Sequence, residues 1–133
     1  RKMIDSIINF CTKRHSATEL AALGALGLPN FPTTKVGVFL RFSLLGVKRH
    51  KRKFGGGFEF SFFDFPESLK KNFILFFVRQ WQTKEKNQTT DEEIVDAVLF
   101  ACASRDLKFA EYWHRREIQR AKIHEKILRF LEL

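Results

Sequence analysis

The sequence predicts a mainly α-helical fold with one small β-hairpin. Apolar residues recur at i, i+3 and i+4 along most of the chain, a pattern typical of amphipathic helices. Two Ser/Thr-x-x-Glu capping boxes, at residues 16–19 and 90–93, mark helix starts. Phe58, Phe60 and Phe62 alternate with Glu and Ser in a short stretch, which indicates a returning strand. We therefore expect helices on both sides of a small β-element.

The first 32 residues predict two helices and a turn. Residues 3–13 carry apolar side chains on one helical face, and residues 14–15 close this helix. The capping box at 16–19 begins a second helix, which Gly27 and Pro29 end. A second proline soon afterwards prevents helix from continuing, so a turn is expected.

The segment from Val36 to Leu44 permits two interpretations. Every second residue is apolar, and the β-branched and aromatic content favours a strand. Alternatively, Thr33 or Thr34 caps a helix that ends at Gly46. Local propensity leans slightly to strand, whereas the preceding helices and turn favour helix. In the helical interpretation we expect these apolar residues to face inward: Val36, Phe39, Leu40 and Leu44.

A dense cationic run follows this segment. Its members are Lys48, Arg49, His50, Lys51, Arg52 and Lys53. The chain carries 24 Lys and Arg against 15 Asp and Glu, a net charge of +9. Residues 1–65 hold +7 of this excess (11 basic, 4 acidic), and the remainder holds +2 (13 basic, 11 acidic). Such a run favours contact with a polyanion, and glycines from Gly55 onward let the backbone approach phosphates closely.

Residues 3–63 resemble a winged helix-turn-helix DNA-binding domain. The resemblance rests on SATELAALGALGL as the first helix of the motif, TTKVGVFLRFSLLG as the recognition helix and VKRHKRKFGGGFEF as the wing. The order and spacing of residues in these segments are similar to those in the winged helices of replication primase-helicases and of transcription regulators. This resemblance implies phosphate contacts at the helix N-terminus (Thr33, Thr34, Lys35), a groove-facing Arg41 and a wing that binds through residues 48–53 and Gly55. Duplex DNA is favoured over RNA.

The second half, residues 66–133, predicts a helical region for dimerisation or partner docking, after a winged domain at residues 1–65. A helix from Pro66 to about Gln82 precedes a polar linker at 83–89. After the capping box at 90–93, Ser104 is expected to cap a long final helix to about Leu131. The expected partner-interface residues are Trp81, Trp113 and Phe130. Cations on the final helix fit a solvated face better than a second phosphate-binding stripe.

Enzymatic chemistry has little support in the sequence. No nucleophile, metalloprotease or P-loop motif occurs, and the four histidines lack metal-ligand spacing, so we expect a non-catalytic protein without metal or cofactor. Cys11 and Cys102 are interpreted as buried reduced thiols. No apolar run approaches the roughly 20 residues that span a bilayer.

A structural role is the main alternative. The Phe excess (16 residues) and the lack of an initiator Met fit a basic accessory subunit of a large assembly, such as an organellar ribosome or a respiratory complex. A DNA-binding protein would be expected in a nucleus or nucleoid. The alternative places the protein in a mitochondrion or another organelle.

Overall fold

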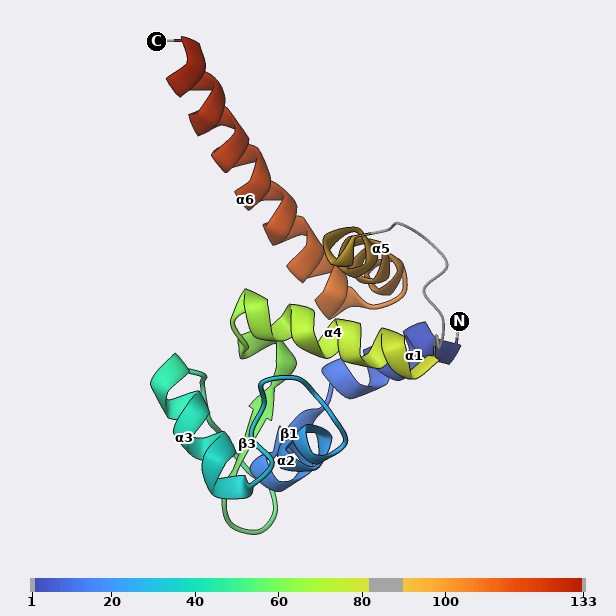
Figure 1. The fold of residues 1–133 in the computed structure, drawn as a ribbon, viewed down its shortest axis with the longest axis vertical. Helices are drawn as coiled ribbons and strands as arrows, with labels where there is room; N and C mark the ends of the chain where they lie inside the picture. The colour runs from blue at the N-terminus through green and yellow to red at the C-terminus, as the bar shows by residue number, and fades with distance from the viewer. Residues whose placement is uncertain (1, 82–89, 133) are drawn as a thin grey trace.

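The computed structural model describes residues 2–81 and 90–132, which form six α-helices and a three-stranded antiparallel sheet (Figure 1). The mainly α class is therefore confirmed. The elements are α1 (Lys2–Cys11), β1 (Arg14–Ser16), α2 (Ala17–Ala25), α3 (Lys35–Leu45), β2 (His50–Lys51), β3 (Phe58–Ser61), the short 3-10 helix η1 (Phe62–Asp64), α4 (Glu67–Trp81), α5 (Asp91–Ala103) and α6 (Leu107–Glu132). The predicted linker at 83–89 lies outside the described residues.

The sheet is small, and β3 is its central strand. β1 and β2 pair with opposite edges of β3, with His15 opposite Phe60 and His50 opposite Glu59. The sequence did not predict β1, because residues 14–15 were assigned to the end of the first helix. Three residues are too short to show a period of two, and the pairing depends on β3, more than 40 residues away.

The predicted capping boxes both form. Ser16 Oγ accepts from the Glu19 backbone N–H at 3.1 Å, and the Glu19 carboxylate accepts from the Ser16 N–H at 3.1 Å. The equivalent reciprocal pair at Thr90 and Glu93 begins α5. Each box satisfies backbone donors that the first helical turn leaves unpaired, so the helix starts are fixed locally.

The predicted start of the final helix is wrong. Ser104 ends α5, and its hydroxyl donates to the Phe100 carbonyl at 3.0 Å. The cap is Asp106, whose carboxylate accepts from the Phe109 backbone N–H at 3.1 Å. Both residue types favour caps, so local composition did not discriminate between them.

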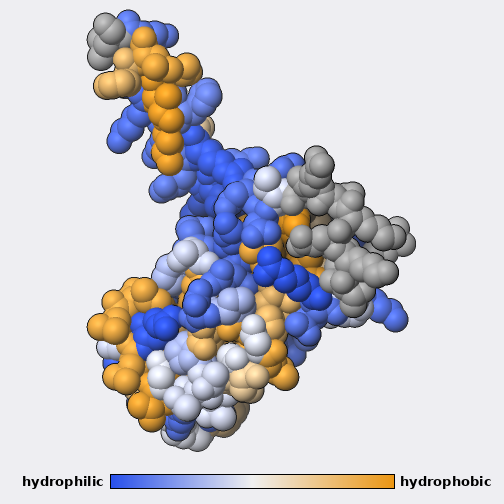
Figure 2. Space-filling model, viewed as in Figure 1, coloured by the Kyte–Doolittle hydropathy of each residue, from blue (hydrophilic) through white to orange (hydrophobic). Residues whose placement is uncertain are grey.

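The segment from Lys35 to Leu45 is a helix, but its predicted inward face is wrong for three of the four residues. Phe39 alone of these is partly buried, with its ring centroid 5.7 Å from that of Phe60. Thr34 caps it by accepting from the Gly37 N–H at 3.1 Å. Val38 and Phe42 are buried, with 0% and 1% of their surface exposed. In contrast, Val36 (67% exposed), Leu40 (62%) and Leu44 (88%) form an outward apolar face. Figure 2 shows hydrophobic surface over α3. Apolar residues lie on both sides of this helix, so periodicity could not decide which side is buried.

An aromatic core fixes this orientation of α3. The Phe42 ring centroid lies 4.8 Å from that of Phe60 on β3 and 5.1 Å from that of Phe65, which precedes α4. Phe73 on α4 extends the cluster, 5.2 Å from Phe65 and 5.5 Å from Phe31. Edge-to-face and tilted pairs of this kind stabilise a core beyond their buried area. The same hydrophobic cluster contains residues on both sides of residue 65.

The C-terminal helices form a second group around α4. Helix α5 packs against α1, α4 and the first half of α6. Beyond residue 116, α6 is exposed and projects away from the rest of the molecule (Figure 1).

Cys11 and Cys102 are free and fully buried, as predicted, and burial raises the pKa of the Cys102 thiol to about 12. In the described parts of the chain, no helix is long and apolar enough to cross a membrane.

The orientation of α3 predicts a sharp contrast between two of its apolar residues. Phe42→Ala should lower the free energy of unfolding by about 3–5 kcal/mol, because it leaves a cavity between α3, β3 and α4. Leu44→Ala should change it by no more than about 0.5 kcal/mol, because Leu44 is exposed. Urea denaturation monitored by circular dichroism measures both. Equal losses would contradict this orientation of the helix.

Candidate nucleic-acid interface

The cationic run lies on an exposed hairpin: it leads into β2, includes both residues of β2 and continues into the loop before β3. Buried Val47 anchors its start, and the Arg52 backbone N–H donates to the Gly57 carbonyl at 3.3 Å to close its loop. Gly55 and Gly57 have φ values of +79° and +93°, in the left-handed region that favours glycine. The three glycines after the cationic run therefore allow a tight turn, which places the run at one end of the small sheet.

Three side chains of the hairpin, those of Arg49, His50 and Arg52, have partners that fix them in place. His50 Nε2 donates to Asp64 Oδ2 at 2.7 Å, and Arg52 Nε lies 4.0 Å from Glu59 Oε2. The Arg49 guanidinium lies 5.3 Å from the centroid of the Phe58 ring. The Arg49 and Arg52 contacts join the hairpin to β3 through side chains, and the His50 contact joins β2 to η1.

The three hairpin lysines are left with their charges in solvent. Lys48, Lys51 and Lys53 are all exposed, and none is ion-paired within residues 2–81 and 90–132. The positive charges of these neighbouring lysines repel one another, so binding of a polyanion would reduce that repulsion. Among the predicted site residues, these lysines are the ones most available to a phosphate.

A groove brings the hairpin together with the N-termini of two helices. It has a volume of about 240 Å³, and Lys35 of α3 and Arg52 of the hairpin both line it. The start of α2 (residues 16–18), the loop at Gly56 and Gly57, and the aromatic residues Phe39 and Phe58 form its other walls. Helix N-termini present partial positive charge and free N–H groups, so the groove suits an anion. The described residues that line it include no carboxylate.

Two acidic side chains near the groove are already engaged. Glu59 pairs with Arg52, whose Nε lies 4.0 Å from Glu59 Oε2. The other is Glu19, in the capping box of α2. Partial desolvation alone would raise its pKa, but hydrogen bonds from Ser16 and His15 outweigh this effect and hold the pKa below its ordinary value. Its charge is therefore retained in the capping box and stabilises the first turn of α2.

The predicted residues around Lys35 serve the helix itself or do not line this groove. Thr34 uses its hydroxyl for the cap, while Thr33 and Lys35 are exposed. Arg41 is exposed, but its Nη1 donates to the Asn30 carbonyl at 2.8 Å, which ties it to the loop before α3. With Leu40 and its apolar neighbours beside it, the outward face of α3 offers few hydrogen-bond donors for base edges.

The predicted partner-interface residues lie on different helices and differ in how exposed they are. Trp81, at the end of α4, is 50% exposed, and Phe130, on the projecting end of α6, is 77% exposed. Trp113 is half-buried, with its ring 5.7 Å from Phe100 and 5.9 Å from the Arg116 guanidinium. Trp113 therefore contributes to the packing of α5 on α6.

Sequence reasoning missed the contribution of α2 to the groove. Ser16 and Thr18 were interpreted only as parts of a helix start, whereas Gly56 and Gly57 were expected to let the hairpin backbone approach phosphates. Their proximity to Lys35 arises because β1 places the start of α2 beside the hairpin across β3. No local signal in the sequence contains this long-range pairing.

The described residues contain no cluster of three or more His, Cys, Asp or Glu side chains that could hold a metal ion.

Comparison with protein-family models, with curated proteins and with solved structures finds no significant match. Function is therefore inferred from the residues and geometry described above.

The hairpin glycines supply an internal test of this geometry. Gly55→Ala and Gly57→Ala should each lower stability by about 1 kcal/mol, because a Cβ is strained at positive φ. Gly56→Ala is the matched control, since Gly56 has an ordinary φ and open space around its Cβ position. This substitution should leave the free energy of unfolding unchanged. Chemical denaturation measures all three, and an equal cost at Gly56 would contradict the turn.

Proposed function

We propose that this protein is a winged helix-turn-helix module that binds duplex DNA through its phosphate backbone. The order α1, β1, α2, α3, β2, β3 supports the proposal, since it places a capped helix, a turn and a second helix before a basic hairpin. The observation that carries it is the groove in which Lys35 and Arg52 meet the N-termini of α2 and α3, beside three lysines that form no ion pair with the described residues.

In the proposed complex, the hairpin follows one strand of the duplex. Lys48, Lys51 and Lys53 neutralise successive phosphates, and counterions released from the DNA supply much of the affinity. A further phosphate enters the groove, where Lys35, Arg52 and the backbone N–H groups of the helix starts bind it. No step of this binding requires a cofactor.

The exposed face of α3 limits the sequence specificity of this binding. Val36, Leu40 and Leu44 can contact thymine methyl groups or sugars, but they cannot form the bidentate hydrogen bonds that distinguish G from A. Arg41 is tied to the Asn30 carbonyl. We therefore propose binding with weak sequence preference, in which phosphate contacts provide most of the free energy.

The same apolar face favours a second candidate function, that of a subunit in a large assembly. Four large apolar side chains of α3 are exposed (Val36, Leu40, Leu44 and Leu45), as is Phe130 on α6. This exposed apolar surface exceeds the isolated apolar residues that are normal on a monomer. In that role the cationic hairpin would contact RNA or an acidic surface, and neighbouring subunits would cover the apolar faces.

Salt-dependent binding tests the leading proposal. Wild-type protein and the triple variant Lys48→Gln, Lys51→Gln, Lys53→Gln are titrated with fluorescent duplex DNA at several salt concentrations. The log–log slope of affinity against salt should fall in magnitude by about 0.9 for each phosphate contact that the variant loses. Fluorescence anisotropy measures the slope.

The matched control removes the same charge from α6 instead. In Lys108→Gln, Lys122→Gln, Lys126→Gln, three exposed lysines far from the hairpin are changed. This variant should keep the wild-type slope. If both variants weaken binding equally, the effect is one of net charge and the hairpin has no special role. If the wild-type protein does not bind DNA, the assembly-subunit function becomes the better account.

A further inference from the structure

A second cationic site lies between α4, η1 and α6. It is an open cleft of about 580 Å³, a size typical of small-molecule sites. Phe63 and Ile123 give it apolar walls, and four cations line it: Lys70, Arg115, Arg116 and Arg120. A smaller cavity of about 150 Å³ shares Lys70 and Arg116 with it and continues between α4 and α5. None of the hairpin cations contributes to either space.

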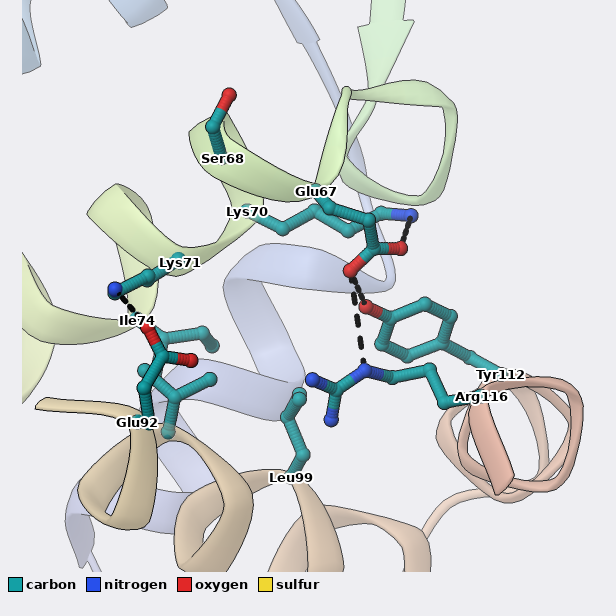
Figure 3. Close-up of a pocket in the computed structure, with 10 residues that line it drawn as sticks. Glu67, Ser68, Lys70, Lys71, Ile74, Glu92, Leu99, Tyr112 and Arg116 are labelled. Atoms are coloured by element: carbon teal, nitrogen blue, oxygen red, sulfur yellow. Dashed lines mark hydrogen bonds and ion pairs between the residues drawn. The ribbon is translucent and has the colours of Figure 1, made fainter. Parts of the chain in front are cut away.

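Three donors in this cleft converge on one carboxylate. Tyr112 Oη donates to Glu67 Oε2 at 2.5 Å, Lys70 Nζ lies 3.4 Å from Glu67 Oε1, and Arg116 Nε lies 3.8 Å from Glu67 Oε2. Figure 3 shows these side chains pointing toward Glu67 from α4 and α6. The Tyr112 contact is short, whereas the two cations are further from the carboxylate than in an optimal charged hydrogen bond.

The donors are buried, but their acceptor is exposed. Lys70 and Tyr112 retain only 7% and 4% of their surface, and the Arg116 side chain retains 18%. The Glu67 side chain is 64% exposed. The positions of the donors are therefore fixed by packing, while Glu67, in the first turn of α4, is free to rotate into solvent. Another anion could take its place without rearrangement of the helices.

Lys70 is an unusual residue to bury in this position. Burial lowers its pKa, nearby Glu67 opposes this effect, and nearby Arg115 adds to it. Its Nζ lies 4.3 Å from the centroid of the Tyr112 ring, a cation–π contact that compensates in part for lost water. A buried ammonium with one long ion pair costs stability. A ligand-binding role would account for its presence.

The carboxylates near the cleft leave its positive charge only partly neutralised. Asp96 pairs with Arg116 at 3.0 Å and with Arg120 at 2.6 Å. Asp64 also acts on Lys70, but its carboxylate accepts from His50. Arg115 is exposed at the rim, and the described residues provide it with no ion-pair partner.

We propose that this cleft binds an organic phosphate, whose phosphate group displaces the Glu67 carboxylate from Lys70, Tyr112 and Arg116. Arg115 contacts the phosphate from the rim, and the organic part of the ligand lies against Phe63 and Ile123. A dianionic phosphate carries more charge and more acceptor oxygens than the carboxylate that it replaces. The site is independent of DNA binding by the hairpin.

Calorimetric titration with phenyl phosphate, inorganic phosphate and benzoate at constant ionic strength tests this proposal. Phenyl phosphate should bind at one site with a Kd of about 1 mM or lower. Inorganic phosphate should bind more weakly because it lacks an apolar part, and benzoate should bind more weakly because it carries less charge. Equal binding of benzoate and phenyl phosphate would overturn the preference for phosphate.

Variants locate the site. Arg115→Gln and Lys70→Met should each weaken phenyl phosphate binding about tenfold, the effect of losing one charge-assisted hydrogen bond. Lys70→Met should melt no lower than the wild-type protein, which separates loss of binding from loss of fold. Glu67→Gln should strengthen binding, because the competing charge is removed.

Lys122→Gln is the matched control, since it removes one exposed charge from the same helix outside the cleft. It should leave the affinity unchanged. The proposal fails if no saturable binding occurs, if Lys122→Gln weakens binding as much as Arg115→Gln, or if Glu67→Gln weakens it. Each of these results is independent of whether the hairpin binds DNA.

Discussion

The packing of Phe42 against Phe60 and Phe65 is the contact on which the rest of the structure depends. It joins α3 to the central strand and to the start of α4, and so determines which side of α3 is buried. With Phe42 inside, the N-terminus of α3 and Lys35 lie beside the hairpin and the start of α2. The same contact turns Leu40 and its apolar neighbours outward, which argues against base reading by this helix.

Positive charge in this protein is divided between two surfaces with different properties. On the hairpin, three lysines are exposed and unpaired in the described structure, which suits a long, hydrated polyanion. In the cleft beside α6, Lys70 is buried and Arg116 is partly buried, Asp96 pairs with Arg116 and Arg120, and Phe63 and Ile123 border the site, which suits a small ligand. Burial, more than charge count, therefore distinguishes the kinds of anion that the two surfaces accept.

The sequence predicts the elements of this fold better than their contacts. Both capping boxes form because their hydrogen bonds are local, and the helical assignment of Lys35–Leu45 is confirmed by the Thr34 cap. The inward face of α3 could not be predicted, because apolar residues occur around much of the helix and only the partner surface decides. Strand β1, the groove and the buried Lys70 all depend on pairing between distant segments. Such contacts have no periodic signal in one sequence.

The most direct test of the central claim is an NMR titration of isotopically labelled protein with a short duplex DNA at low salt. We predict that the largest backbone amide shift changes occur at residues 16–18, 33–35 and 48–57, where the hairpin and the two helix starts meet. The exposed end of α6 should be unaffected. Changes concentrated on α6 or on the outward face of α3, with the hairpin unperturbed, would contradict the account.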